Sequence, residues 1–364
     1  MRQNLSKVPS DTYFRERLDE VEPRYLQTSM NRLIAQLQRG KILEAYRFFD
    51  DHYLVSIDGT GYFSSHEIHC ESCCVKHHRD GSVTYYHQML AAVLVHPLEK
   101  NVFPLALEAI QKKDGKTKND CEHEALKRLL QTLKRSHPHL KLMVTLDALY
   151  ADSSIIRLLQ TLNIRFMITA RKDDLKYLFE FYEASKKSLF EQHLNNVHHS
   201  YRYVNKLPLN DSHQECEVNM LEYEEAGMKK KQYFCWVTDM PLKESTVMSV
   251  MRGGRARWKI ENETFNTLKN QGYQFEHNFG HGYHHLSGVL AYLMFLAFLI
   301  DQIQGFCCPY FRSALKKMKR KLYLWNKMRG MFLHYLIDSW EQFYEAIRGG
   351  MKQTIRLAEL LDTS

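Results

Sequence analysis

Apolar positions near the N-terminus recur at the spacing of helices. The segment 10–19 begins with Ser10, a residue that caps helices well, and places Phe14 and Leu18 four residues apart. A second helix is predicted over residues 24–37. The chain is therefore expected to open with two helices.

The apolar runs that follow have the composition of strands. Residues 53–57 form a β-branched apolar run that ends in Asp58, Gly59, Thr60 and Gly61, which predicts a strand that stops at Asp58 and enters a tight turn. Two further runs of β-prone residues predict strands that continue the first as a meander: 84–96 and 102–109.

After a polar break at 111–120, helical and strand-like patterns alternate. The predicted elements are a helix, a buried strand, a helix and a strand: 122–135, 140–146, 153–162 and 164–169. Three strands followed by helix, strand, helix and strand is the order of a ribonuclease-H-like domain. The predicted fold class is therefore α/β, with a mixed sheet flanked by helices.

Two aspartates fall at matching places in this order. Asp58 follows the first strand, and Asp147 directly follows the strand 140–146. Side chains at the strand ends of a mixed α/β sheet emerge into a crevice, where polar ligands can converge. An aspartate after a strand is often just a turn residue, but two at equivalent ends favour a shared site.

The segment 171–240 differs from its surroundings because it is polar, rich in charge and built of short alternating pieces. This pattern predicts a β-rich insertion. Pieces this short would not form a large core of their own, so the insertion is expected to pack onto the main domain.

A third acidic residue, Glu261, lies on a predicted helix over residues 255–269. Arg257 is four residues earlier and shares its face, which by itself is compatible with an ion pair on a solvated helix. A helix that follows the last strand crosses the active edge of such a sheet, so Glu261 can complete a cluster with Asp58 and Asp147. Three carboxylates suit two Mg²⁺ ions, with Mn²⁺ as an alternative.

The most apolar stretch of the chain, 286–300, is followed at once by Asp301. It is shorter than the roughly 20 residues that a membrane helix needs. We interpret it as a buried core helix and expect no membrane association.

Composition supports a folded protein with a polyanionic partner. A chain of 364 residues with 44% hydrophobic residues can bury a substantial core, which excludes a disordered chain. Fifty Lys and Arg against 42 Asp and Glu give a net charge of +8, which is compatible with DNA binding. Eight cysteines without an N-terminal apolar segment predict reduced thiols and a cytoplasmic location, at the nucleoid when DNA is bound.

Other clusters offer metal ligands or cations. The run 69–78 contains the pairs Cys70-x2-Cys73 and Cys74-x2-His77, whose spacing suits zinc, but these cysteines can also be ordinary small residues of a loop. The histidines of 277–285 are either ligands or part of a connecting turn. The cationic run 316–321 is either a solvated helix face or a contact for the DNA backbone.

The segments around the three acids are similar to the acidic motifs of bacterial insertion-sequence DDE transposases, of the family-four type. These segments are Ile-Asp-Gly-Thr at 57–60, Leu-Asp-Ala at 146–148 and Arg-Trp-Lys-Ile-Glu at 257–261. That group carries a β-rich insertion between its second Asp and its Glu, and about 110 residues separate them here. The resemblance runs from about residue 8 to residue 304.

The third motif of that group is Tyr-x2-Arg-x3-Glu-x6-Lys. Arg257 and Glu261 match it, whereas Gly254 replaces the Tyr and Leu268 replaces the Lys, with Lys269 one residue later. One residue rotates a helical side chain by about 100°, so Lys269 is a looser candidate than Arg257.

The resemblance implies cut-and-paste DNA transposition. The transposon end would be hydrolysed, the freed 3′-hydroxyl would attack the opposite strand to form a hairpin, and the end would then join target DNA. Asp58, Asp147 and Glu261 would be the catalytic metal ligands, and Arg257 and Lys269 would contact DNA. The implied partners are double-stranded DNA, as terminal inverted repeats and as target, and a second copy in a homodimer.

Two other functions remain open at this point: a ribonuclease-H-like DNA nuclease, and an inactive or truncated relative that only binds DNA. The expected segments are a helical N-terminal segment, two parts of the catalytic domain on either side of the insertion, and a helical C-terminal region: 1–50, 51–170, 171–240, 241–305 and 306–364. About fifty residues precede Asp58, fewer than a separate DNA-recognition domain usually has, so 1–50 is expected to be a truncated recognition region.

Overall fold

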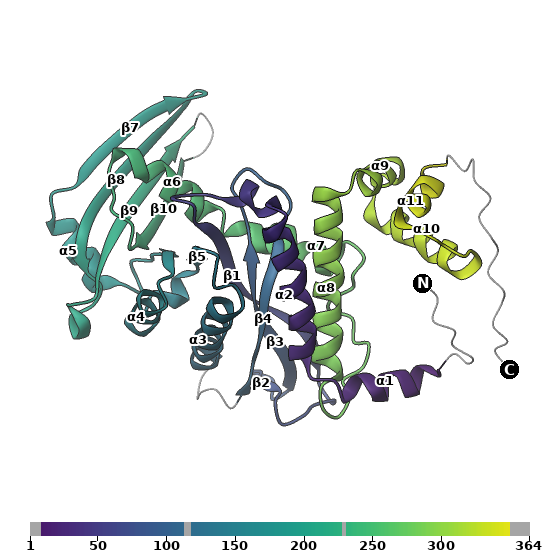
Figure 1. The fold of residues 1–364 in the computed structure, drawn as a ribbon. Helices are drawn as coiled ribbons and strands as arrows, with labels where there is room; N and C mark the ends of the chain where they lie inside the picture. Colours follow the sequence, from purple (N-terminus) through teal and green to yellow (C-terminus); the bar gives the residue numbers. More distant parts are fainter. Residues whose placement is uncertain (1–8, 113–117, 228–230, 350–364) are drawn as a thin grey trace. The chain divides into compact units, whose positions relative to one another are not determined.

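The computed structural model describes residues 9–112, 118–227 and 231–349 (Figure 1). The chain divides into two compact units. The sheet unit is Gln27–Thr264, and the helical unit consists of Met1–Leu26 and Phe265–Ser364.

The described strands are β1 Tyr53–Ser65, β2 Cys74–His77, β3 Val83–Leu94, β4 Phe103–Ile110, β5 Leu142–Leu146, β6 Arg165–Thr169, β7 Ser188–Leu194, β8 Val197–Pro208, β9 Glu217–Ala226 and β10 Lys231–Thr238. The α-helices are α1 Asp11–Asp19, α2 Pro23–Arg39, α3 Lys118–Ser136, α4 Ser153–Thr161, α5 Lys176–Ala184, α6 Glu244–Arg255, α7 Asn266–Asn270, α8 Leu286–Cys307, α9 Pro309–Met318, α10 Lys321–His334 and α11 Trp340–Arg348. Short 3-10 turns include η1 Ile42–Tyr46, η3 Ala148–Tyr150 and η4 Asp211–His213, and η5 Ile260–Phe265 is a π-helix.

The sheet unit is built on one mixed sheet. Its strand order is β2-β3-β1-β5-β6-β10-β9-β8-β7, with β4 also paired to β3. β1 is antiparallel to β3 but parallel to β5, and β5 is parallel to β6. The central succession β4, β3, β1, β5, β6 agrees with the predicted α/β class and is consistent with a ribonuclease-H-like fold.

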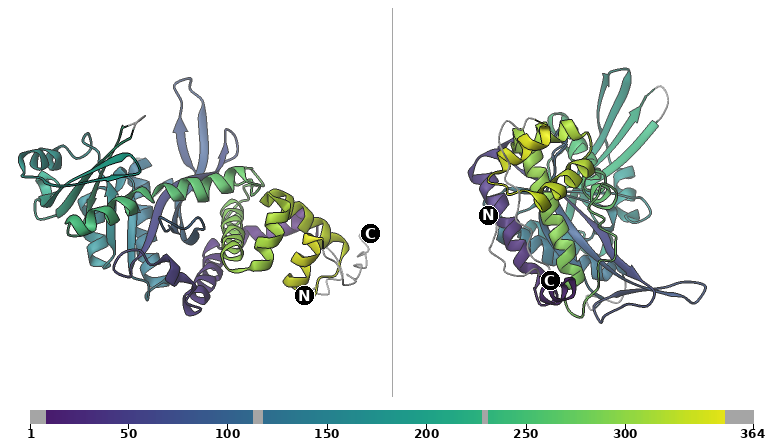
Figure 2. Two further views of the ribbon diagram at one scale, coloured as in Figure 1. Left: turned by 90° about the horizontal axis from the view of Figure 1, so that it is seen from above. Right: turned by 90° about the vertical axis from the view of Figure 1, so that its right-hand side faces the viewer.

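Helices cover both faces of the central strands. In Figure 2, α3 and α4 lie on one face and α6 lies on the other. Every residue of β5 is buried, as expected of a strand covered on both sides. α6 approaches β6 closely because it carries Gly253, where an added Cβ would lie 2.4 Å from Met167 Cε.

β1 does not end at Asp58, and the predicted turn after it is wrong. The strand continues to Ser65, with Gly59 and Gly61 inside it, because β3 pairs with it on both sides of Asp58. The strand that ends near Asp58 is the neighbouring β5, because the last residue of β1 that pairs with β5 is Ser56. Asp58 therefore lies where β1 loses one neighbouring strand.

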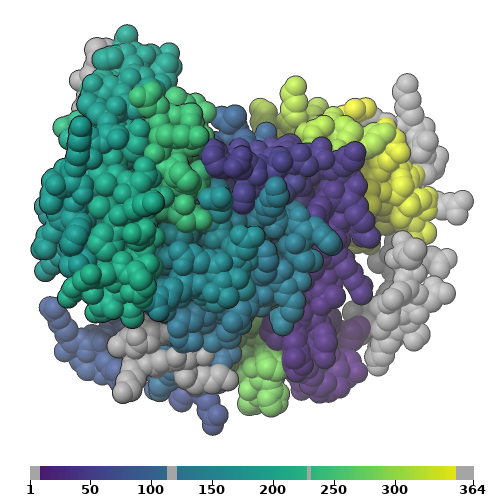
Figure 3. Space-filling model, turned by 60° about the vertical axis from the view of Figure 1, so that its left-hand side comes forward, coloured from purple at the N-terminus to yellow at the C-terminus, as the bar shows by residue number. Residues whose placement is uncertain are grey.

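Two elements were not predicted. β2 lies in the expected loop between the first two strands and pairs with the start of β3. α5 precedes β7 in the segment expected to be β-rich, and it buries Leu178, Phe179 and Tyr182 at helical spacing. The strands β7 to β10 extend the sheet through the pairing of β10 with β6, and in the space-filling view their atoms are continuous with those of the preceding strands and helices of this unit (Figure 3).

The helix predicted over residues 255–269 is not a uniform α-helix. α6 ends at Arg255, a turn follows, and η5 then takes the π-helical form before α7 begins. π-helical turns are rare and occur frequently at functional sites. Here the π-helix begins one residue before Glu261.

The helical unit is organised around α8. Asp19, the last residue of α1, accepts hydrogen bonds from the backbone N–H groups of Tyr283, His284, His285 and Leu286 at 2.8–3.2 Å. Its carboxylate thereby caps the N-terminus of α8. The helices α9, α10 and α11 share a separate core made of Phe311, Ala314, Leu324, Met331, Phe343, Tyr344 and Ile347.

The apolar helix α8 is longer than predicted. It has 22 residues, because Asp301 and the glutamines that follow continue it, so the predicted end at residue 300 is wrong and length alone does not exclude a membrane span. By length and composition α8 is the one described helix that could cross a bilayer. Half of its most apolar 18-residue stretch is buried inside the protein. Asp301 accepts a hydrogen bond from Tyr273 Oη at 2.5 Å, a pairing suited to a protein interior.

Candidate active site

The ladder between β1 and β5 brings two of the predicted acids together. Ser56 pairs with Thr145 in the parallel register, and Asp58 and Asp147 each lie two residues beyond that pair. Neighbouring strands lie roughly 5 Å apart, so the backbone carries both aspartates to the same level of the sheet. Asp147 follows β5 directly, as predicted.

The third acid reaches the same place from the helical layer. Ser56 Oγ donates a hydrogen bond to the backbone carbonyl of Arg257 at 3.0 Å, so this face of β1 contacts the turn after α6. Asp58 lies two residues after Ser56 and points to the same face. Glu261 is one helical turn after Arg257, at the start of the π-helix.

Arg257 joins two of the acids directly. Its Nη1 donates to Asp58 Oδ2 at 3.1 Å and to Glu261 Oε1 at 3.0 Å. The Arg257 side chain is 8% exposed, against 22% for Asp58 and 37% for Glu261. A charged group this buried is strongly destabilising without a partner of opposite charge. The guanidinium therefore holds the carboxylates of Asp58 and Glu261 close to each other.

Local hydrogen bonds orient both aspartates. Asp58 Oδ1 accepts from the N–H of Gly59 at 2.8 Å, and Asp147 Oδ1 accepts from the N–H of Ala148 at 2.7 Å. Asp147 thereby caps the turn η3, and Arg171 Nη2 lies 3.6 Å from the same oxygen. Both carboxylates are thus fixed by their own backbone before any ligand arrives.

The electrostatics of Asp58 mark the site as acidic. Burial is the main cause that raises the pKa of Asp58, to about 6, and the charge of Glu261 acts in the same direction. The Gly59 N–H and the Arg257 guanidinium oppose this shift but do not cancel it. Asp58 is therefore harder to ionise in this site than in water, mainly because its carboxyl group is buried.

Three carboxylate side chains supply the oxygen ligands that hard divalent cations prefer. Mg²⁺ prefers carboxylate oxygens and usually takes one or two of them, with water and phosphate as the remaining ligands. Asp58, Asp147 and Glu261 offer that donor set, whereas soft thiolate or imidazole ligands are absent from the described contacts of this cluster. The residues fit Mg²⁺ or Mn²⁺.

Two residues that the sequence did not single out adjoin the acids. Glu122, which is buried on α3, accepts a hydrogen bond from Tyr150 Oη at 2.9 Å. A Cβ at Gly59 would lie 3.2 Å from Glu122 Oε1, which places this fourth carboxyl beside Gly59, the residue that follows Asp58. Burial, Glu122, Asp58 and Asp147 together raise the pKa of Tyr150. No spacing or motif distinguishes Glu122 in the sequence.

A cleft of about 530 Å³ opens beside Asp147. It is lined by cationic and aromatic side chains together with acids: Asp147, Thr169, Ala170, Arg171, Lys172, Asp173, Phe179, Glu183, Glu222, Tyr233, Phe234, Cys235, Trp236, Gly254, Arg255, Arg257 and Trp258. Trp258 is 48% exposed, and Arg257 lies over its ring at 4.6 Å. Cations bind phosphates, and exposed aromatic rings stack on bases, so these surroundings suit a nucleic acid.

Gly254, which stands where the third motif of the similar transposases has Tyr, has a structural explanation. A Cβ at this position would lie 2.4 Å from Trp236 Cε2 and Nε1. Trp236 of β10 thus fills the space beside α6 where a larger residue would otherwise stand. The same Trp236 lines the cleft, so glycine here allows α6 to pack against the wall of the site.

The looser candidates lie in the helical unit. Lys269 Nζ forms an ion pair with Glu276 Oε1 at 2.7 Å. The run 316–321 spans the end of α9 and the start of α10, and Lys316, Lys317 and Lys319 are exposed. Their contacts with DNA remain predictions.

Comparison with known proteins identifies the family. A search of curated proteins finds no match for the chain. The family described as transposase DDE domain matches residues 75–299, which include Asp147, Arg257 and Glu261, whereas Asp58 precedes the matched residues. The match covers more than half of the 364 residues, so this chain belongs to the transposase DDE domain family.

Proposed function

We propose that this protein is an active insertion-sequence DDE transposase that cuts transposon ends and joins them to target DNA. The observation that carries the proposal is the Arg257 bridge between Asp58 and Glu261, with Asp147 at the level of Asp58 in the sheet. The β1–β5 register brings Asp58 level with Asp147, and Arg257 binds both Asp58 and Glu261. Membership of the transposase DDE family supports the same conclusion.

Asp58, Asp147 and Glu261 would hold two Mg²⁺ ions, or Mn²⁺ in their place. When bound, the ions would supply a Lewis acid that stabilises charge on the attacking and leaving oxygens of the phosphodiester. The protein's own part is positioning. Arg257 holds the carboxylates of Asp58 and Glu261 at a fixed separation. The backbone N–H groups of Gly59 and Ala148 orient the carboxylate oxygens of Asp58 and Asp147.

The cleft would hold the DNA beside the acids. Arg171, Lys172 and Arg255 line it and would bind phosphates, while the exposed ring of Trp258 offers a surface for a base. Arg257 also lines the cleft and would hold a phosphate with the part of its guanidinium that points away from the carboxylates. Lys269 would add a further phosphate contact.

The segment 171–240 would be the β-rich insertion of the family-four type. It carries β7 to β10 between the second and third acids, and its last strand joins the catalytic sheet at β6. Residues of this segment, from Arg171 to Trp236, line the cleft. The insertion would therefore contact the DNA end. The partners would be terminal inverted repeats, target DNA and a second copy of the chain.

The decisive experiment incubates the purified chain with Mg²⁺ and duplex DNA that carries the inverted repeats flanking its gene. Hairpin-ended products and joints with a target plasmid would support the proposal. Hydrolysis without joints would favour a ribonuclease-H-like nuclease instead, and a gel shift without cleavage would favour a protein that only binds DNA. A duplex with scrambled ends serves as the control.

A further inference from the structure

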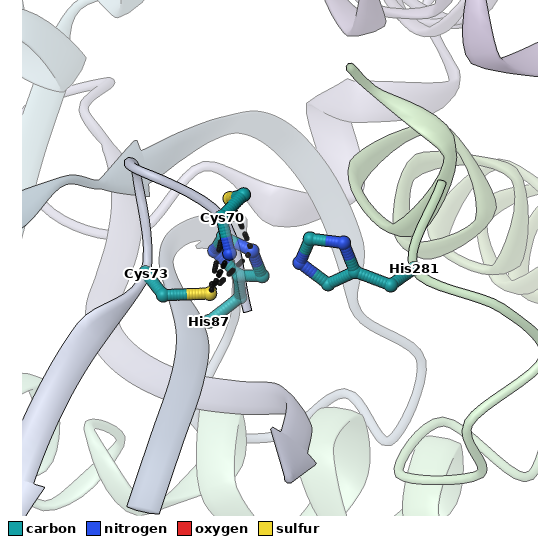
Figure 4. A group of neighbouring side chains, drawn as sticks. All are labelled: Cys70, Cys73, His87 and His281. Atoms are coloured by element: carbon teal, nitrogen blue, oxygen red, sulfur yellow. Dashed lines mark hydrogen bonds between the residues drawn. The ribbon is translucent and has the colours of Figure 1, made fainter. Parts of the chain in front are cut away.

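Two cysteines and a histidine meet at the end of β1 that lies beyond Asp58. Cys70 and Cys73 lie in the connection between β1 and β2, and His87 lies on β3, where it pairs with Phe63. Figure 4 shows the two thiols and the His87 ring directed toward one another. Antiparallel pairing of β1 and β3 thus brings a third donor to the cysteine pair from farther along the chain.

The spacing of the three donor atoms is that of ligands around one ion. Cys70 Sγ lies 3.8 Å from Cys73 Sγ, and His87 Nε2 lies 3.6 Å and 3.3 Å from the two sulfurs. A tetrahedral zinc with Zn–S of about 2.3 Å and Zn–N of about 2.0–2.1 Å separates two sulfurs by about 3.8 Å and a sulfur from a nitrogen by about 3.6 Å. The observed triangle matches those separations within about 0.3 Å.

The surroundings orient the donors as a metal site requires. The N–H of Cys73 donates to the carbonyl of Cys70 at 3.1 Å, and the N–H of Cys70 points to Cys73 Sγ at 3.4 Å, a contact that would stabilise a thiolate. The ring of Tyr62 stacks on that of His87, with centroids 5.8 Å apart and 12° between planes. Cys73 is 1% and His87 is 8% exposed, so the site is enclosed.

The second pair seen in the sequence does not share this geometry. Cys74 is the first residue of β2, and its Sγ points to the carbonyl of Ile110 at 3.8 Å. His77, at the other end of β2, is exposed. Successive residues of an extended segment point in opposite directions, which separates Cys74 from Cys73.

We propose that Cys70, Cys73 and His87 bind a structural zinc ion that fastens the β1–β2 connection to β3. This site is distinct from the carboxylate cluster and takes a softer ion. A structural zinc site has four ligands. The three donors leave one position of the tetrahedron to a further ligand.

The first experiment measures zinc in the full chain, expressed with added zinc and purified without chelator. About one zinc per chain is expected, and Cys70→Ser, Cys73→Ser and His87→Ala should each reduce this to a small fraction. Cys74→Ser and His77→Ala are the matched controls and should retain the zinc. Loss of zinc in the controls but not in the first three variants would overturn the assignment.

A second experiment does not depend on the variants folding. Replacement of zinc by Co²⁺ in the wild-type chain should give a thiolate-to-cobalt charge-transfer band and the visible absorption of a tetrahedral ion. Absence of both bands, or wild-type protein that carries no zinc and a Cys70–Cys73 disulfide, would refute the proposal.

Discussion

Arg257 Nη1 lies 3.1 Å from Asp58 Oδ2, although 199 positions separate the two residues in the chain. The same nitrogen lies 3.0 Å from Glu261 Oε1. A buried guanidinium thus bridges two of the three acids and offsets part of their charge.

Removal of a single acid should abolish cleavage. Asp58→Asn, Asp147→Asn and Glu261→Gln each remove a metal ligand worth several kcal/mol, so end cleavage should fall by roughly a hundredfold or more. DNA binding in a gel shift should persist, because the cationic lining of the cleft is intact. Glu263→Gln, two residues further along the π-helix, is the control and should keep its activity. A fully active acid variant would remove that residue from the site.

Loss of the bridge should destabilise the metal-free protein. In Arg257→Gln the carboxylates of Asp58 and Glu261 face each other without a cation, which should cost about 3 kcal/mol at neutral pH. Added Mg²⁺ should restore part of this, since it supplies positive charge at the same place. Urea unfolding with EDTA or Mg²⁺ measures both effects. Arg255→Gln breaks a more exposed pair with Glu225 and should cost no more than about 1 kcal/mol; an equal loss in the two variants would contradict the bridge.

The raised pKa of Asp58 predicts a pH dependence of stability in EDTA. Its folded pKa of about 6 lies above the ordinary value of 3.8, so folding favours the protonated form. The stability that this provides is complete below about pH 4 and is lost as the pH rises through 6, a total of about 3 kcal/mol. Asp58→Asn lacks the titrating group and should gain stability relative to wild type between pH 4.5 and 7. A difference in unfolding free energy that does not change with pH would disprove this.

Gly254 should tolerate no side chain. In Gly254→Ala the new Cβ would overlap the Trp236 ring, and the helix or the ring must move, at a cost of about 1–3 kcal/mol. Because Trp236 lines the cleft, end cleavage should fall as well. Gly330→Ala is the control: it lies in α10 with nothing within 4 Å of the added Cβ, so it should stabilise that helix by up to about 1 kcal/mol. Thermal unfolding of the two variants should shift in opposite directions.

Asp19 should stabilise α8 in a pH-dependent manner. Burial opposes its ionisation, but the four backbone N–H groups of residues 283–286 outweigh burial and lower its pKa. Asp19→Ala should therefore cost about 2 kcal/mol at neutral pH and speed hydrogen exchange at the start of α8. A lowered pKa gives stability that is present above about pH 4 and is lost as the pH falls through the folded value. The exposed Asp11→Ala is the control, and equal exchange in the two variants would argue against the cap.

The sequence by itself determined the order of the elements around the first two acids and their residues. β5, α4 and β6 were predicted within two residues of their observed ends, because burial on both faces and helical spacing are local signals. Asp147 was placed correctly after β5 for the same reason. Glu261 and Arg257 were found as a pair because residues four apart on a helix always share a face.

Only the tertiary structure decided which side chains meet. The glycines after Asp58 predicted a turn, yet pairing with β3 extends β1 to Ser65. The position of Glu122 beside Gly59 depends on the packing of α3, and that of His87 beside Cys70 and Cys73 depends on the β1–β3 register. Register and packing are set by contacts between distant segments, which leave no period in the local sequence. The sequence therefore predicts the three acids of the cluster but not the contacts that hold them. The proposed zinc site at the other end of β1 could be found only from the tertiary structure.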